Sequence, residues 1–293
     1  MKTIGEVLKL SASFLEERKV DRARRSAEEL LSHTLKIKRM DLYLQYDKPV
    51  EERELSILRE LLKKKAKGEP LEYATGEVDF LDCRIKVDRR VLIPRPETEI
   101  LASLIVKRLK GKPLAGKILW DLCTGSGCLG IALKKALPEL TVVLSDVSKD
   151  ALSLARENAS GLDVELLEGD LLTPFQGRRA DFIVCNPPYV SQAEYLVLDP
   201  SVRDFEPKAA LVGGEKGTEY YERLQRDLPS YLNPGAQAFF EIGSGQGEAI
   251  KQIFSGESWS NQELLNDWAG HPRFFFLENQ VLSRVSCSDN LTM

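Results

Sequence analysis

Residues 181–189 read Asp-Phe-Ile-Val-Cys-Asn-Pro-Pro-Tyr, an apolar run that stops at two prolines. Four consecutive apolar residues, three of them favoured in strands, predict a buried strand of a parallel sheet. Pro187 and Pro188 cannot continue a sheet or a helix, so the strand is expected to end at Cys185, just before Asn186. Ligands of open α/β sheets bind just beyond the carboxyl ends of such strands, which is where this Asn-Pro-Pro-Tyr sequence is expected to lie.

The tetrapeptide has the chemistry of a slot for an NH2 group. Asn186 precedes a proline, which favours extended backbone, and its side chain offers a carbonyl oxygen. Pro187 and Pro188 have no N–H and present only carbonyl acceptors, while Tyr189 offers a flat aromatic face. Acceptors on both hydrogens of a planar NH2 group direct its nitrogen lone pair toward an electrophile. The alternative is a proline-rich turn that binds nothing.

A glycine-rich loop is predicted after an earlier apolar run. Its sequence, residues 121–127, reads Asp-Leu-Cys-Thr-Gly-Ser-Gly. Glycines there allow a sharp turn and a close approach to a ligand. Gly125, Gly127 and Gly130 also satisfy the GxGxxG pattern, so a dinucleotide is an alternative ligand. Asp121, directly before the loop, would repel a pyrophosphate but suits a ligand with a positive sulfonium or ammonium group. Asn-Pro-Pro-Tyr has no role in hydride transfer, which also disfavours a nicotinamide cofactor.

Acidic residues at the ends of three predicted strands complete a pocket for S-adenosylmethionine. Asp121, Asp146 and Asp170 follow the first, second and third strands of the expected sheet. The predicted contacts are Asp121 near the cationic amino-acid end of the ligand, Gly125 and Gly127 against the nucleoside, Asp146 on the ribose, and Asp170 with Leu171 beside the adenine. A glycine-rich turn without a ligand is the remaining alternative.

From residue 117 onward, strand and helix patterns alternate, which predicts a doubly wound, Rossmann-like α/β domain. The expected strands are 117–122, 141–145, 164–167, 181–185, 236–242 and 274–277, with a possible further strand at 263–268. The expected helices are 128–137, 148–159, 218–231 and 246–254.

The first 75 residues have a different pattern, with helices expected from a Thr3–Glu6 capping box, over 22–35, and over 51–67 with Gly68 at its end. Runs at 77–80 and 83–87 predict a β-hairpin, and a capped helix is expected from Pro96. Arg95 has no capping role and is a candidate for contact with a ligand or partner. The expected division is a helical substrate-recognition domain at 1–75, a hairpin linker at 76–93, a methyltransferase domain at 94–280 and a tail at 281–293.

Composition limits the classes of function. The net charge of −4 argues against binding mainly to nucleic-acid phosphates, although residues 1–75 carry 17 basic against 14 acidic residues. Five cysteines without disulfide-like spacing indicate reduced, intracellular thiols, and two histidines make a histidine-rich metal site unexpected. Without a signal peptide or a long apolar run, a soluble cytoplasmic protein with no membrane partner is expected.

Over residues 4–278 the chain resembles the release factor glutamine N5-methyltransferases, the HemK/PrmC family of class I methyltransferases. The motifs that carry the resemblance are Gly68-Glu-Pro-Leu-x-Tyr73, Leu92-Ile-Pro-Arg-Pro-Glu-Thr-Glu99, Asp121-Leu-Cys-Thr-Gly-Ser-Gly127, Asn186-Pro-Pro-Tyr189, Phe205-Glu-Pro-x-x-Ala-Leu211 and Glu241-Ile-Gly-x-x-Gln-Gly247. Asn-Pro-Pro-Tyr alone is shared with DNA and RNA amino-methyltransferases, whereas residues 92–99 together with the helical N-terminus are more specific.

The resemblance implies that S-adenosylmethionine is the methyl donor and that the substrate is the glutamine of the Gly-Gly-Gln motif in class I peptide release factors. Asn186 and the Pro187 carbonyl would hold the glutamine NH2, beside Pro188 and Tyr189. The donor site implied by the resemblance is lined by Cys123, Thr124, Gly125, Ser126, Gly127, Asp146, Leu171 and Asn186. Two residues depart from the family: Cys123 stands where glycine is usual, and Leu171 where some members place an aromatic residue.

Two other functions remain open at this point. One is an N6-adenine or guanine amino-methyltransferase acting on DNA or RNA, which would need a basic groove that the acidic remainder of the chain disfavours. The other is a non-catalytic module that binds translation factors. Glu206 is either support for a substrate pocket or a loop cap, and Glu241 is interpreted first as structural. No metal and no direct contact with nucleic acid are expected.

Overall fold

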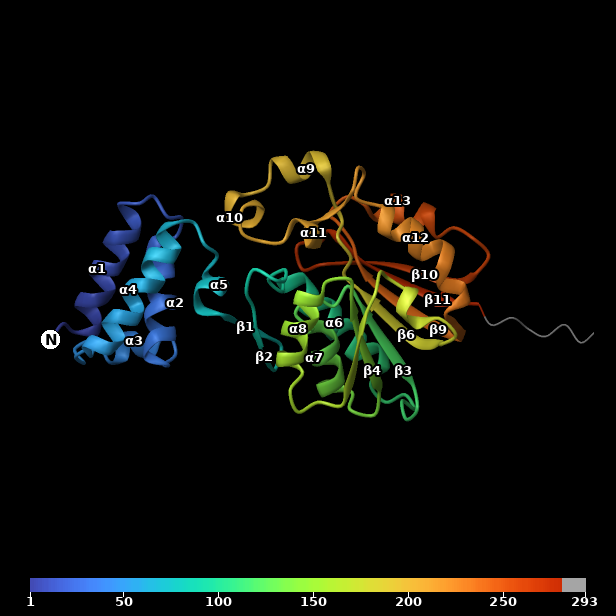
Figure 1. The fold of residues 1–293 in the computed structure, drawn as a ribbon, viewed down its shortest axis with the longest axis horizontal. Helices are drawn as coiled ribbons and strands as arrows, with labels where there is room; N and C mark the ends of the chain where they lie inside the picture. The colour runs from blue at the N-terminus through green and yellow to red at the C-terminus, as the bar shows by residue number, and fades with distance from the viewer. Residues whose placement is uncertain (281–293) are drawn as a thin grey trace, which may run out of the picture.

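The computed structural model describes residues 1–280, which form a helical bundle joined to an α/β unit (Figure 1). The expected tail at 281–293 lies outside the described residues. Within residues 1–280, no helix combines the length and the apolar character needed to span a membrane.

The helical bundle consists of α1 (Ile4–Glu16), α2 (Ala23–Leu35), α3 (Asp41–Leu44), α4 (Glu52–Ala66) and α5 (Leu71–Thr75). Thr3 and Glu6 form the predicted capping box at the start of α1. Gly68, at φ +89°, ends α4 as expected. Apolar faces of these helices, including Leu8, Leu30 and Leu58, pack into a core of their own.

The β-hairpin that follows is formed by β1 (Glu77–Phe80) and β2 (Cys83–Lys86), with Phe80 opposite Cys83. Phe80 and Ile85 are buried in the core of the α/β unit. Asn158 fixes the hairpin further, because its side chain accepts a hydrogen bond from the Lys86 N–H at 2.9 Å and donates one to the Lys86 carbonyl at 3.0 Å. The hairpin is therefore packed onto the α/β unit.

One seven-stranded sheet organises that unit, in the order β10-β11-β9-β6-β3-β4-β5. Its strands are β3 (Ile118–Leu122), β4 (Thr141–Asp146), β5 (Val164–Glu168), β6 (Ala180–Cys185), β9 (Leu232–Glu241), β10 (Trp259–Asn266) and β11 (Pro272–Asn279). Five neighbouring strands, β5, β4, β3, β6 and β9, are parallel to one another. At the other edge, β11 is antiparallel to both of its neighbours, β9 and β10. The chain adds β4 and β5 on one side of β3 and then returns to place β6 on its other side, so the strand order switches between β3 and β6.

Helices cover both faces of this sheet (Figure 1). One face carries α6 (Pro96–Leu109), α7 (Cys128–Ala136) and α8 (Lys149–Asn158), and the other carries α12 (Glu219–Asp227) and α13 (Gly247–Ile253). Alternate residues of one strand belong to the two cores, since Leu119 packs with α6 and α7 whereas Trp120 packs with α12 and α13. Burial on both faces explains why the central strands read as continuous apolar runs.

The predicted fold class is confirmed, including the strand near residue 263, and the elements that the sequence pattern missed are short. They are α3, α5, η1 (Thr173–Phe175), β7 (Val190–Ser191), α9 (Gln192–Leu196), α10 (Pro200–Arg203), α11 (Lys208–Leu211) and β8 (Val212–Gly214). The helix expected over 218–231 ends at Asp227 and continues as the 3₁₀ turn η2 (Leu228–Ser230), because Pro229 supplies no N–H for another α-helical turn.

Candidate active site

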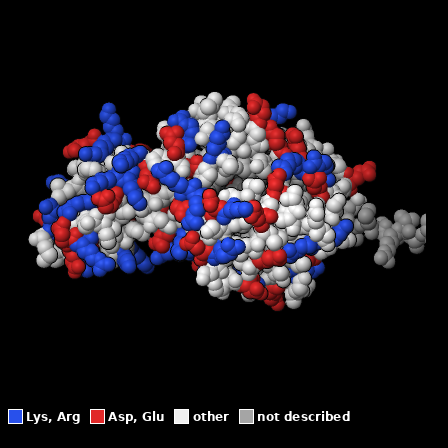
Figure 2. Space-filling view, in the orientation of Figure 1, with Lys and Arg blue, Asp and Glu red and all other residues white. Residues whose placement is uncertain are grey.

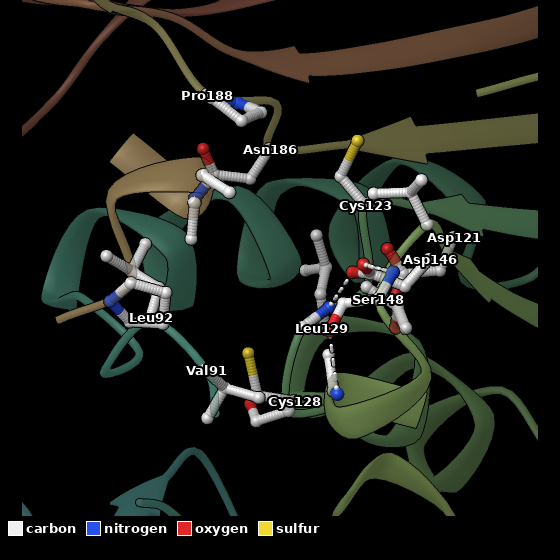
Figure 3. Close-up of a pocket in the computed structure, with 18 of the residues that line it drawn as sticks. Val91, Leu92, Asp121, Cys123, Cys128, Leu129, Asp146, Ser148, Asn186 and Pro188 are labelled. Atoms are coloured by element: carbon white, nitrogen blue, oxygen red, sulfur yellow. Dashed lines mark hydrogen bonds between the residues drawn. The ribbon is translucent and has the colours of Figure 1, made fainter. Parts of the chain in front are cut away.

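A cavity opens at the carboxyl ends of β3, β4, β5 and β6, where the strand order switches. Figure 3 shows Asn186 and Pro188 on one side of it, Asp121 and Asp146 on the other, and Cys123 between them. Of the predicted site residues, those that line the cavity are Asp121, Cys123, Thr124, Gly125, Ser126, Asp146, Asp170, Leu171, Asn186 and Pro188. Gly127, Pro187, Tyr189, Arg95 and Glu206 do not line it.

The glycine-rich loop turns through three left-handed residues. Cys123, Gly125 and Gly127 have φ values of +55°, +53° and +82°. Left-handed backbone is unfavourable for a residue with a Cβ, which gives a physical reason for glycine at position 123 and a strained backbone for the cysteine found here. Gly130 is required for another reason, since a Cβ there would lie 2.2 Å from Leu144 Cδ2 and 2.9 Å from Asp121 Oδ2.

Asp121 is the buried carboxyl group at the base of the cavity, with 1% of its surface exposed. Its Oδ2 accepts hydrogen bonds from the Thr124 hydroxyl at 2.6 Å and the Gly130 N–H at 2.9 Å. Burial raises the pKa of Asp121 to about 7, against the lowering effect of these two hydrogen bonds. A cationic ligand in the cavity would therefore favour the ionised form of this group.

Asp146 holds the loop from the end of β4. Its Oδ2 accepts a hydrogen bond from the Gly125 N–H at 2.9 Å, and its Oδ1 accepts one from the Ser148 N–H at 2.9 Å. Burial also raises the pKa of Asp146, in opposition to these backbone donors. Each carboxylate oxygen retains a second lone pair, so Asp146 can still accept from a ligand hydroxyl.

The next strand end contributes Asp170 and Leu171. Asp170 Oδ2 accepts a hydrogen bond from Arg223 at 2.5 Å, which fixes the carboxylate at the cavity edge. Leu171 is 7% exposed and has a φ of +49°, so its backbone is left-handed and its side chain packs with Trp120 and Phe175. Leu171 therefore offers an aliphatic surface at a position where the resemblance implies an aromatic residue in some members of the family.

On the opposite side, Asn186 is bonded through its amide nitrogen. Its Nδ2 donates to the Thr98 hydroxyl at 3.3 Å, which leaves its Oδ1 as the polar atom available to a ligand. Tyr189 does not line the cavity, and its hydroxyl donates to Glu241 at 3.3 Å and accepts from Arg273 at 3.0 Å. Burial raises the pKa of Tyr189 to about 12, so this hydroxyl stays protonated.

Arg95 and Glu206 pair with each other instead of reaching the cavity. Arg95 donates to Glu206 Oε1 at 2.6 Å, and the Ile93 N–H donates to Glu206 Oε2 at 3.0 Å. Glu206 is 4% exposed, and its two hydrogen bonds fix the segment that carries Leu92 and Pro94. Both of these residues line the cavity.

Several lining residues were not identified from the sequence, among them Leu92, Pro94, Thr98, Pro207 and Tyr220. Thr98 had a detectable signal, because it precedes Leu101 and Ala102 by one helical turn and so falls on the buried face of α6. Leu92 and Pro94 lie within a motif that the sequence analysis singled out. Tyr220 gave no signal distinct from its amphipathic helix.

A doubly wound sheet, a glycine-rich loop between acidic strand ends, and an Asn-Pro-Pro-Tyr turn whose prolines lack N–H donors together define a class I methyltransferase. Comparison with known proteins agrees at the level of fold: a T. thermophilus 16S rRNA N2 G1207 methyltransferase, solved with AdoMet and guanosine, matches 70% of this chain and 50% of its own with a TM-score of 0.50 and 16% identity.

Models of two protein families match the sequence, the PrmC N-terminal domain at residues 6–76 and the methyltransferase small domain at residues 96–201. The release factor glutamine methyltransferase of Geobacter sulfurreducens is 41% identical over 86% of this chain and 88% of its own length. The protein of the same name from Chlamydia trachomatis serovar D is 40% identical over 97% of both chains. The chain belongs to the family of release factor glutamine methyltransferases.

Proposed function

We propose that this chain transfers a methyl group from S-adenosylmethionine to the side-chain amide nitrogen, N5, of the glutamine in the Gly-Gly-Gln motif of class I peptide chain release factors. The observation that carries the proposal is the position of Asn186 and Pro188, which line a cavity that also holds Asp121, Asp146 and the glycine-rich loop. Membership in the family supports the choice of glutamine over a nucleobase as the acceptor.

The residues around the cavity fit the donor. Two carboxyl groups, Asp121 and Asp146, face a ligand that carries a sulfonium and an ammonium group. Of the described residues that line the cavity, Arg90 alone is basic, and Asp88 binds it at 2.7 Å. Open space lies where a Cβ of Gly125 would project, which leaves room for a ligand against the loop. We assign the amino-acid end to Asp121, the ribose hydroxyls to Asp146, and the adenine to the surface of Leu171 beside Asp170.

The bound donor supplies an electrophilic methyl group whose transfer turns a sulfonium into a neutral thioether. The protein makes the glutamine amide a better nucleophile. Asn186 Oδ1 and the Pro187 carbonyl each accept one hydrogen of the NH2 group, which holds the nitrogen lone pair toward the methyl group. These acceptors also stabilise the positive charge that develops on nitrogen before it loses a proton to solvent. Neither proline has an N–H that would compete for the same position.

The helical bundle, residues 1–75, is proposed to recognise the release factor. Figure 2 shows many Lys and Arg side chains over this part of the molecule, with Asp and Glu among them. Lys63, Lys64 and Lys67 are exposed at the end of α4. The chain there abuts the segment that follows Asn-Pro-Pro-Tyr, since a Cβ on Gly68 would lie 3.7 Å from the Phe205 ring. A short Gly-Gly-Gln loop offers little area, so selection of one protein needs such a second surface.

Mass mapping tests the reaction. Intact release factor is incubated with the enzyme and S-adenosylmethionine, and the expected product carries one methyl group on the Gly-Gly-Gln glutamine. A release factor with that glutamine replaced by asparagine is the matched control and should remain unmodified. Methylation of RNA or DNA with no change in the release factor would contradict the proposal.

Charge reversal tests the docking surface separately. The variants Lys63→Glu, Lys64→Glu and Lys67→Glu are combined in one protein, and the control carries Lys107→Glu, Lys110→Glu and Lys112→Glu near the far end of α6. The first protein should lose kcat/KM for intact release factor by about tenfold while its donor binding is unchanged, because its encounter is less favourable. Equal kcat/KM values for the two proteins would refute a role for these lysines.

A further inference from the structure

The strand register brings together three polar residues that the proposed reaction has not used as a group. In the parallel pair β6 and β9, Cys185 lies opposite Phe240, so Asn186 and Glu241 follow at the same edge of the sheet. The first turn of α6 reaches this edge and places Thr98 between them. Thr98 and Glu241 are 2% and 0% exposed, so solvent cannot replace their hydrogen bonds.

The hydrogen bonds in this group run in one direction. The Thr98 hydroxyl donates to Glu241 Oε2 at 2.7 Å. A hydroxyl has a single proton, so with that proton given to the carboxylate its oxygen can only accept from Asn186. The partner of Thr98 must then be the NH2 of Asn186, as the 3.3 Å contact with Nδ2 has it. This assignment follows from the chemistry of the three groups, and it turns Asn186 Oδ1 away from Thr98.

Glu241 is the common acceptor of the network. Its Oε1 accepts from the Tyr189 hydroxyl at 3.3 Å and lies 3.5 Å from Arg273, which is itself 12% exposed in its side chain. Arg273 also donates to the Tyr189 hydroxyl at 3.0 Å. The hydroxyls of Thr98 and Tyr189 thus both donate to the Glu241 carboxylate, and the Arg273 guanidinium lies beside it.

We propose that Thr98 and Glu241 are positioning residues that fix which end of the Asn186 side-chain amide faces the substrate. The proposal rests on the proposed function, since it concerns how the acceptor for the glutamine NH2 is prepared. With Nδ2 held by Thr98, Asn186 presents its carbonyl oxygen to the substrate NH2. In the reversed orientation, the Asn186 NH2 would face the substrate NH2, and two donors would meet without an acceptor.

Two isosteric variants and a rescue separate this role from simple packing. Thr98→Val removes the hydroxyl at constant shape. Glu241→Gln supplies an amide that can donate to Thr98 and thereby reverse the direction of the hydrogen bonds between these residues. Each is expected to lower the single-turnover rate by about three- to tenfold, the effect of one hydrogen bond, with the Kd for S-adenosylmethionine changed by less than about twofold. Thr98→Ser keeps the hydroxyl and should restore the rate.

A double-mutant cycle with Asn186→Ala decides whether Thr98 acts through Asn186. If it does, Thr98→Val should have no further effect on the rate once Asn186 is alanine. If Thr98 only supports the packing of α6 on the sheet, the same three- to tenfold loss should appear in both backgrounds. That second result would overturn the proposal.

An NMR measurement gives an answer that does not depend on activity. The side-chain NH2 of Asn186 is assigned by its loss in Asn186→Ala. One of its two protons should be shifted by the hydrogen bond in the wild type and in Thr98→Ser, and this shift should be lost in Thr98→Val. Identical signals in the wild type and Thr98→Val would refute the orientation. Failure of the wild type to methylate a release factor would instead contradict the proposed function and leave this test of orientation intact.

Discussion

Donor binding should weaken as pH falls if, as we propose, the buried Asp121 carboxyl group faces the cationic end of S-adenosylmethionine. The pKa of Asp121 is raised to about 7 by burial, so the group is protonated below this pH and ionised above it. If the ionised form binds the donor, affinity is present above pH 7 and is lost as pH decreases. From the ionised fractions at a pKa of about 7, the Kd for S-adenosylmethionine should rise about 25-fold between pH 7.5 and 5.5.

Isothermal titration calorimetry at several pH values measures this dependence directly. The donor's own ammonium group remains largely protonated over this interval, so it contributes little to the change. Asp121→Asn keeps an oxygen that can accept from Thr124 and Gly130, and removes the charge. It should bind the donor weakly, with little change in Kd over the same range.

Asp146→Asn is the matched control at the neighbouring carboxyl group. Asp146 contributes to the raised pKa of Asp121, so its replacement should move the midpoint of the transition to a slightly lower pH without abolishing it. A wild-type Kd that is constant from pH 7.5 to 5.5 would refute the reasoning, as would an unchanged transition in Asp121→Asn.

Three further substitutions give distinct expected results. Asn186→Ala should slow transfer by a factor of about 10²–10³ because one preorganised acceptor is lost, whereas donor binding persists; single-turnover rates near wild type would contradict it. Asp146→Ala should weaken donor binding by about 1–3 kcal/mol, measured by calorimetry, and an unchanged affinity would place the ribose elsewhere. Cys123→Gly should be more stable to urea than Cys123→Ala by about 1 kcal/mol, because only glycine is unstrained at a φ of +55°; equal stabilities would show that the loop relaxes.

The sheet was predictable from sequence because its central strands are buried on both faces. A run such as residues 181–185 carries a strong signal, and glycine or proline marks where it stops. The segment between residues 190 and 214 was not predictable, since β7, α9, α10, α11 and β8 each contain two to five residues. Elements of that length show no full period of apolar residues, and tertiary contacts determine them.

The site was predictable in its chemistry and less so in its geometry. Asp121, Asp146 and Asn186 line the cavity. They could be identified beforehand because strand ends and glycine turns are local features of the sequence. The pairing of Arg95 with Glu206 joins residues 111 positions apart, and no local pattern reports such a contact. The hydrogen bond from the Tyr189 hydroxyl to Glu241 likewise joins residues 52 positions apart, and no local pattern reports it.

The segment after Asn-Pro-Pro-Tyr is held at its two ends by the Gln246 side chain and by the pairing of β7 with β8. Gln246 donates to the Tyr189 carbonyl at 2.9 Å and the Gly217 carbonyl at 3.3 Å, and Val190 pairs with Val212 across β7 and β8. A Cβ on Gly213 would lie 2.3 Å from the Pro188 carbonyl oxygen, so the two strands of chain approach as closely as glycine permits.

Between these anchors, α9 and α10 project outward, and Leu196 and Val197 are 70% and 83% exposed. Because the ends are clamped, changes of length or sequence within residues 192–204 need not move Asn186, and lengthening a surface loop costs little free energy. This stretch can therefore diverge in sequence and length while Asn-Pro-Pro-Tyr keeps its position at the cavity.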